Sequence, residues 1–281
     1  MLSESIGEFI RLLREYFLVF FGSKLVYASI VLMIISAIVS AAILLSGNEN
    51  LKNALALSKD NPWGIVTANF VHGSFQHLLE NIFSFTSLTF AIFLFSLVLY
   101  SSKKHIARST SNNVRKLFKI SYYVSLKTSF FYGLAFFLGL FIPGITSYVY
   151  CLLYNPLMQA LGISSADYSL LGLLVTYSFC LGARIIAEDM VKKKYYPTIM
   201  YFTFLGTFLF YQFFIEPETL IGSWKEKINV VGHIAGLIIG FIVGLFNMFY
   251  AYVKLKKNRS LSHINSMRGE NHGCGLCYHR T

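Results

Sequence analysis

The sequence of 281 residues has little charge, since Asp, Glu, Lys and Arg together make up 13% of it. An average soluble domain carries about 25%. This composition excludes a water-soluble domain with a polar surface, and it also excludes intrinsic disorder, which requires many charged and few apolar residues. With 4 Cys and 20 Gly in the whole chain, a disulfide-rich scaffold and a collagen-like chain are excluded as well.

What the sequence has in abundance is apolar residues. They make up 55% of the chain and include 27 Phe and 18 Tyr, and the mean hydropathy is +0.58. A helix needs roughly 20 apolar residues to cross a bilayer core of about 30 Å. Six stretches meet this requirement, so we expect an all-α polytopic membrane protein with a bundle of six transmembrane helices. The predicted spans are residues 25–45, 74–100, 128–150, 162–182, 197–215 and 229–253.

The net charge of +11 is distributed unevenly along the chain. If the N-terminus is cytoplasmic, 20 of the 24 Lys and Arg residues fall on the cytoplasmic side of the six predicted spans. By the positive-inside rule, this pattern predicts a multi-pass protein of the cell membrane with both termini in the cytoplasm. The basic residues are compatible with contacts to anionic lipid headgroups of the bilayer, and nucleic acid is not expected as a partner.

The same pattern divides the chain into three regions. Residues 1–24 form a cytoplasmic amphipathic segment, which we expect to lie along the inner membrane surface. Residues 25–253 form the transmembrane core, and residues 254–281 form a basic cytoplasmic tail. The longer predicted loops inside the core are residues 47–61, 101–127 and 216–228.

Polar side chains inside predicted spans are costly and are therefore candidates for a functional site. His77 and Asn81 are four residues apart and share one face of the second predicted span. Ser164 lies in the first turn of the fourth, where free backbone N–H groups favour a developing anion. Tyr168 follows one turn later on the same face, and His233 lies near the outer end of the sixth span.

The predicted topology places four of these side chains, Ser164, His233, His77 and Asn81, in the outer half of the membrane. A serine beside a histidine supplies a nucleophile and its base. Side-chain donors together with a helix N-terminus can form an oxyanion hole. The pattern therefore predicts a hydrolytic site to which three helices contribute.

The motifs are ordered along the chain as W-x3-T-x2-F-x-H-x4-H-x3-N at residues 63–81, G-x-S at 162–164 and H-x2-G-x3-G at 233–240. This ordered set resembles the rhomboid intramembrane serine proteases, and the resemblance covers about residues 25–253. It implies a six-helix bundle around a water-accessible cavity that opens to the outer side. The implied activity is hydrolysis of peptide bonds in or beside transmembrane segments of other membrane proteins.

The resemblance also implies roles for individual residues. Ser164 is the nucleophile and His233 the general base, in a dyad without a third carboxylate. His77 and Asn81, with the backbone N–H of Ser164, line the oxyanion hole. The implied partners are transmembrane protein substrates and the lipid bilayer, with neither a cofactor nor a metal. The resemblance leaves the oligomeric state open.

Three further residues are implied to support the site. His72 matches the outer histidine of the family, Tyr168 the tyrosine that packs on the catalytic imidazole, and Gly162 the first glycine of the serine motif. The sequence departs from the family at Ser165, where glycine is usual, and at Gly64, where arginine often follows the tryptophan. Ser165 favours the main alternative, a weak or inactive rhomboid-like pseudoprotease that binds membrane clients.

A second alternative is a transporter that uses the buried histidines and acids, for which repeats and broken helices in both halves are expected. The acids concerned are Glu80 and Asp167, which stand inside predicted spans without a visible basic partner. We interpret both as protonated, hydrogen-bonded structural groups.

Two other segments allow more than one interpretation. The tail contains His272, Cys274, Cys277 and His279 within eight residues, which could hold Zn²⁺, although closing a tetrahedron in so short a loop is strained. We expect a disordered tail without a metal. The fifth predicted span is rich in aromatic residues, which either pack and face lipid or form a lateral gate for substrates. These residues are Phe208, Phe210, Tyr211, Phe213 and Phe214.

Overall fold

The structure, a computed structural model, is all-helical in the part of the chain that it describes. Five helices there are long and apolar enough to cross a membrane, which supports the predicted polytopic helical membrane protein. Most of the fifth predicted span and all of the loop after it lie outside the described part. The described residues are 2–106, 109, 111–154, 160–192, 196–201, 203 and 230–270.

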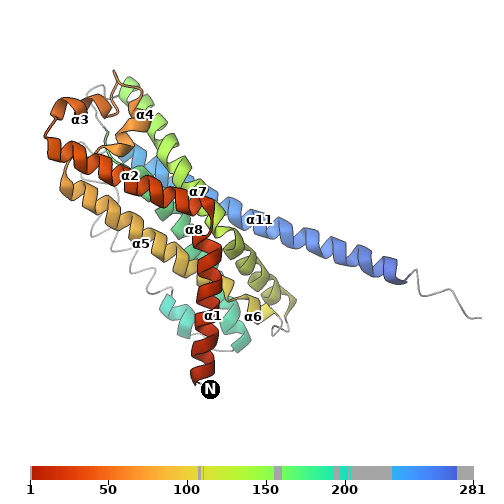
Figure 1. The fold of residues 1–281 in the computed structure, drawn as a ribbon. Helices are drawn as coiled ribbons and strands as arrows, with labels where there is room; N and C mark the ends of the chain where they lie inside the picture. Colours follow the sequence, from red (N-terminus) through yellow and green to blue (C-terminus); the bar gives the residue numbers. More distant parts are fainter. Residues whose placement is uncertain are drawn as a thin grey trace, which may run out of the picture.

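The five long helices form one bundle (Figure 1). They are α2 (Lys24–Ser46), α5 (Phe75–Tyr100), α7 (Asn112–Leu153), α8 (Ser164–Lys192) and α11 (Val230–Glu270). The shorter elements are α1 (Leu2–Phe21), α3 (Glu49–Leu55), α4 (Gly64–Thr67), the 3₁₀ turn η1 (Ala68–Phe70) and α6 (Lys103–Ile106). The predicted bounds of α2 and α5 are confirmed to within one residue.

Several predicted boundaries are wrong. The predicted loop 101–127 is helical from Asn112 onward, and α8 and α11 run well past the ends predicted for them. The predicted loop 47–61 contains helix α3. The predicted bounds followed the limits of apolar runs, whereas backbone hydrogen bonds of a helix continue through polar residues wherever water or headgroups solvate the side chains.

Helix α1 is anchored to the bundle by its last turns. Tyr16 and Phe20 are fully buried, and the Tyr16 ring packs against Phe93 and Tyr100, with centroid distances of 5.8 and 5.0 Å. The Tyr16 hydroxyl donates to the backbone oxygen of Ser125 on α7 at 3.0 Å. The amphipathic segment therefore turns part of its apolar face towards protein, beside α5 and α7.

Helices α8 and α11 pack with their backbones in direct contact. A Cβ atom at Gly240 would lie 1.7 Å from the backbone oxygen of Ser169, and one at Gly236 would lie 2.3 Å from that of Ser165. From the other side, a Cβ at Gly172 would lie 2.1 Å from a backbone oxygen of α11. Small residues allow this approach between membrane helices. The packing brings the first turns of α8 and α11 together.

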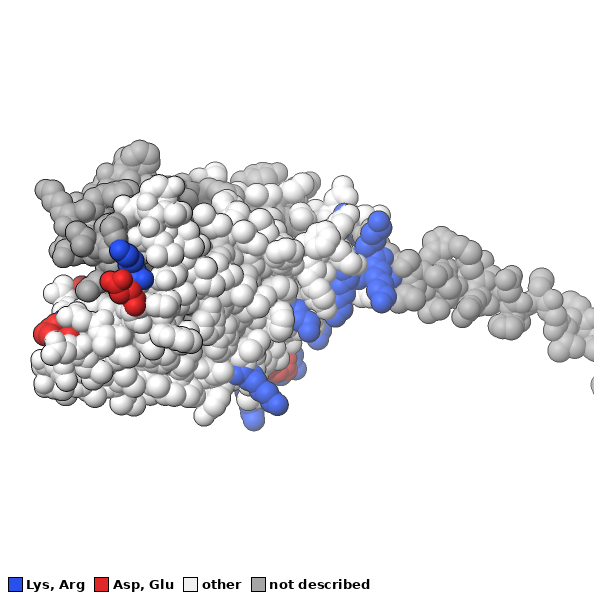
Figure 2. All heavy atoms as spheres, turned by 90° about the horizontal axis from the view of Figure 1, so that it is seen from above, with Lys and Arg blue, Asp and Glu red and all other residues white. Residues whose placement is uncertain are grey.

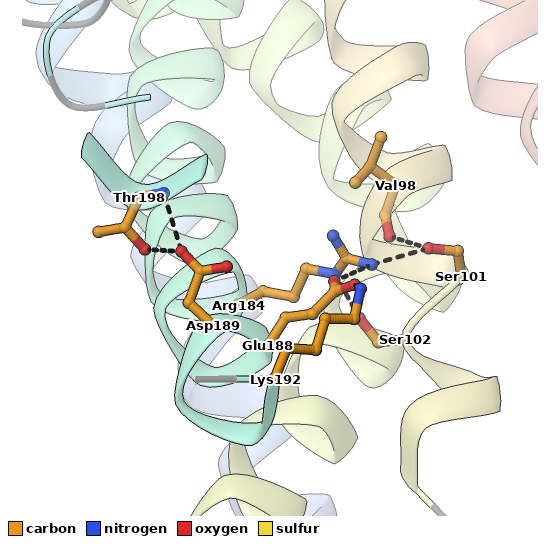
Figure 3. A network of polar contacts seen from close by, with 8 residues as sticks. All are labelled: Val98, Ser101, Ser102, Arg184, Glu188, Asp189, Lys192 and Thr198. Carbon is orange, nitrogen blue, oxygen red and sulfur yellow. Dashed lines mark hydrogen bonds and ion pairs between the residues drawn. The ribbon is translucent and has the colours of Figure 1, made fainter. Parts of the chain in front are cut away.

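Charged side chains separate along the bundle. In the face shown in Figure 2, Lys and Arg gather towards the end from which α11 projects, while few stand at the opposite end. At the basic end, Arg184 of α8 donates to the hydroxyls of Ser101 and Ser102 at 3.2 and 3.3 Å and pairs with Glu188 at 3.0 Å (Figure 3). Lys192 also pairs with Glu188. This network fixes the end of α5 against α8.

We predict that Gly240→Ala lowers the free energy of unfolding by about 1–3 kcal/mol, because the added methyl group would overlap the α8 backbone. The matched control is Gly7→Ala, also inside a helix, where a Cβ would meet nothing within 4 Å. Alanine there should leave the protein equally or slightly more stable. Thermal unfolding of both variants in detergent checks this. Equal shifts for the two variants would contradict the close packing of α8 on α11.

Candidate active site

The backbone before α8 sets the position of Ser164. Gly162 has a φ of +97°, a conformation that residues with a Cβ rarely adopt. Its N–H donates to the backbone oxygen of Ala68 at 2.8 Å, and Leu57 and Ala160 exchange two backbone hydrogen bonds of 3.0 Å. The chain therefore turns sharply into α8, and Ser164 becomes its first residue. Backbone N–H groups of this first turn have no partner within the helix.

His233 lies opposite Ser164, in the first turn of α11. The Oγ atom of Ser164 and the Nε2 atom of His233 are 2.8 Å apart and hydrogen-bonded. The ring of Tyr168 stacks on the imidazole at a centroid distance of 4.2 Å and an angle of 13°. His233 is 8% exposed, and its Nδ1 atom has no hydrogen-bond partner within the described part of the chain. The pair has the geometry of a serine nucleophile and its base.

The first turns of α5 bring further polar groups to the same place. Ser74 caps the helix by accepting from the backbone N–H of His77 at 3.2 Å. The rings of His72 and His77 meet edge to face at 5.2 Å, and Asn81 Nδ2 lies 2.8 Å from His72 Nε2. A Cβ at Gly162 would lie 3.1 Å from His77 Cε1 and 3.3 Å from Asn81 Nδ2. Both side chains therefore border the turn that carries Ser164.

A shallow pocket opens beside Ser164 and Ser165. Its other walls are formed by small and apolar residues and by the polar Asn69, and the pocket is small, so it suits a small side chain rather than an aromatic one. The residues that line these walls include Leu57, Gly64, Ala68, Leu140, Gly144 and Ala160.

The structure shows the surroundings of Ser165 and Gly64, the two positions at which the sequence departs from the family pattern. Ser165 is 8% exposed and lines the pocket, while its backbone oxygen faces Gly236. At Gly64, a Cβ would lie 2.3 Å from the Cα atom of Leu57, so this backbone has no room for the arginine that is common there. The segment after Trp63 is thus held by backbone packing.

The structure brings the serine, the three histidines, Asn81, Tyr168 and Gly162 together, and it adds one residue that the prediction missed. Ser40 of α2 is fully buried, and its Oγ atom is 2.6 Å from His72 Nδ1. The sequence signal that could have indicated Ser40 is the presence of three serines, at positions 29, 36 and 40, in a span otherwise rich in aliphatic residues.

The two acids differ from each other. Glu80 accepts a hydrogen bond of 2.9 Å from Gln76 at an exposed position. Asp167 is 3% exposed, and within the described residues neither of its carboxyl oxygens has a hydrogen-bond partner. Of the two predicted hydrogen bonds, the one to Glu80 is therefore seen, whereas none is seen for Asp167 within the described residues.

Comparison with protein-family models, curated proteins and solved structures gave no match for this chain. The resemblance to rhomboid proteases thus depends on the motifs themselves. The aromatic residues considered for a lateral gate lie outside the described residues, and so does the Cys and His cluster of the tail.

We predict that Asp167→Ala raises the free energy of unfolding by about 1 kcal/mol at neutral pH. Burying a polar group without a hydrogen bond costs about 1–3 kcal/mol, and a small cavity offsets part of the gain. Asp60→Ala, at an exposed position, should change stability by less than about 0.5 kcal/mol. Thermal unfolding in detergent measures both. Loss of stability in Asp167→Ala would mean that the carboxyl group makes a favourable contact.

Proposed function

We propose that this protein is a rhomboid-like intramembrane serine endopeptidase with six transmembrane helices, which hydrolyses peptide bonds in or beside transmembrane segments of other membrane proteins. The observation that carries the proposal is the 2.8 Å hydrogen bond between Ser164 Oγ and His233 Nε2. It joins the first turns of two apolar helices that could cross a membrane.

In the proposed reaction, Ser164 Oγ attacks the carbonyl carbon of the scissile bond while His233 Nε2 accepts the hydroxyl proton. His233 then gives that proton to the leaving amine, and the C-terminal fragment of the substrate departs with this amine as its new N-terminus. Water attacks the acyl-enzyme, again with His233 as base, and regenerates the free serine. Tyr168, stacked on the imidazole, holds the ring plane through both steps.

The tetrahedral intermediate carries a negative oxygen that needs donors. The backbone N–H of Ser164 at the start of α8 supplies one, and the positive end of the helix dipole adds to it. His77 and Asn81 border the same turn and supply side-chain donors. These three groups come from two helices that are fixed before substrate arrives, so little reorganisation is needed during the reaction.

The pocket beside Ser164 supports a preference for a small residue at the cleavage point. A helical substrate hides its peptide bonds in its own hydrogen bonds, so it must unwind locally before Ser164 can reach a carbonyl carbon. Transmembrane proteins with helix-weakening residues near the cleavage point are therefore the proposed partners. No cofactor enters this chemistry.

The charge separation supports an orientation. The first turns of α5, α8 and α11 meet away from the basic end of the bundle. With the basic end in the cytoplasm, the site opens towards the outer side of the cell membrane and both termini are cytoplasmic.

The main alternative is a rhomboid-like pseudoprotease that binds membrane clients. The observation that favours it is Ser165, which lines the pocket at a position where the family usually has glycine. In this alternative Ser165 beside Ser164 crowds the site, so the protein binds membrane clients without cleaving them.

The decisive experiment is labelling with a fluorophosphonate probe in detergent micelles, combined with cleavage of a transmembrane reporter. Wild type should react with the probe and cut the reporter, and Ser164→Ala should lose both. Ser169→Ala is the matched control, because Ser169 is a buried serine of the same helix that donates to Ala135. Labelling that persists in Ser164→Ala contradicts the nucleophile assignment, and a wild type without labelling or cleavage supports the pseudoprotease.

Activity should fall as the medium is acidified. His233 can accept the serine proton only while it is neutral, so protonation of its ring removes the general base. An ordinary histidine has a pKa of about 6.5. The pH profile of kcat/KM, measured between about pH 4 and 9 in micelles, checks this. Constant activity down to about pH 4 would exclude His233 as the base.

A further inference from the structure

Behind the proposed oxyanion hole, three buried polar side chains from three segments form a chain of hydrogen bonds. Ser40 of α2 is fully buried, His72 before α5 is 1% exposed and Asn81 of α5 is 6% exposed. Ser40 Oγ lies 2.6 Å from His72 Nδ1, and His72 Nε2 lies 2.8 Å from Asn81 Nδ2. The catalytic chemistry described above uses only the last of these residues.

The backbone acceptor beside Ser40 favours one direction for every bond in this chain. The Ser40 hydroxyl has one hydrogen, and it donates this hydrogen to the backbone oxygen of Phe70 at 2.9 Å. Ser40 Oγ can therefore only accept from His72, so the proton of the imidazole is on Nδ1. In that tautomer Nε2 is an acceptor, and the Asn81 amide donates one of its two N–H bonds to it.

Burial keeps His72 in this neutral state. Burial first, and the neighbouring His77 second, lower the pKa of His72 to about 3. The ring therefore stays uncharged at physiological pH, and the position of its one proton is set by its hydrogen-bond partners.

We propose that Ser40 is a positioning residue that fixes the tautomer of His72 and thereby aims the amide N–H of Asn81 at the oxyanion. With the opposite tautomer, His72 would present Nε2–H to Asn81, and the amide would have to rotate so that its oxygen faces the ring. The amide nitrogen of Asn81 would then turn away from Gly162. In the structure this nitrogen lies beside Gly162, at 3.3 Å from the position that a Cβ there would take. This role of Ser40 rests on the proposed function of the site.

The chain offers a matched control for the test. Ser36 is one turn before Ser40 on α2, is equally buried and donates to the backbone oxygen of Asn69 at 2.6 Å. Ser40→Ala and Ser36→Ala both delete a buried hydroxyl from the same helix. Only Ser40→Ala removes the acceptor for His72 Nδ1.

The experiment is a double-mutant cycle on cleavage of a transmembrane reporter. Asn81→Ala should lower kcat by roughly 100- to 1,000-fold, the effect of one lost oxyanion donor, and Ser40→Ala by roughly 10- to 100-fold, with KM little changed in both. The double variant should be no slower than Asn81→Ala alone, because Ser40 acts through Asn81. Ser40→Thr, which keeps a hydroxyl, should restore kcat, and Ser36→Ala should leave kcat near wild type. Multiplicative losses in the double variant, or an equal kcat loss in Ser36→Ala, would overturn the proposal.

A second readout does not depend on activity. The ¹⁵N resonances of labelled His72 should place the proton on Nδ1 in wild type, Ser36→Ala and Ser40→Thr, and this preference should be lost in Ser40→Ala. A wild type that keeps this tautomer but cuts no substrate and takes no probe would refute the proposed function while leaving the Ser40–His72 contact established. A proton on Nε2 in the wild type would overturn the positioning role even in an active enzyme.

Discussion

The contact between the backbones of α8 and α11 is the constraint on which the candidate site depends. Lipid tails are as apolar as the helix surfaces, so no hydrophobic force drives these helices together, and close packing has to do so. Gly236 and Gly240 let α11 approach until it touches backbone oxygens of α8. Only at this separation can His233 reach Ser164 with a 2.8 Å hydrogen bond. A wider spacing would leave a half-buried serine and a buried histidine, each without its partner.

Polar groups buried at both ends of the bundle are held by hydrogen bonds and an ion pair. At one end, a chain of hydrogen bonds joins Ser40 to His72 and His72 to Asn81. At the other end, Arg184 is shared between two serine hydroxyls and Glu188. In apolar surroundings a buried polar group without a partner costs free energy. Three side chains among the described residues have buried polar atoms without a partner. Two of them, His233 and Asp167, lie in the first turns that form the site, and the third is Asn247, farther along α11.

Hydropathy predicted most of the architecture because the bilayer limits the choices to helices of a certain length. The bounds of α2 and α5 follow from their apolar runs, since the chain turns soon after each run ends. The long helix α7 could not be bounded in this way. Its first turns carry polar and basic side chains, and its interior contains Pro143. Proline has no N–H to donate to the residue four positions earlier, and one turn later the hydroxyls of Thr146 and Ser147 donate to the backbone oxygen of Pro143.

The sequence by itself determined which residues are candidates for the site, because histidine and asparagine are costly inside apolar spans and the spacing of the motifs placed them, with Ser164, near helix starts. It did not determine their partners. That Asn81 pairs with His72, that Ser40 of a different helix accepts from the same ring, and that Asp167 has no partner among the described residues were decided only by the tertiary structure. The physical reason is that contacts between helices depend on their relative rotation and depth. Periodicity along a single helix carries no information about either.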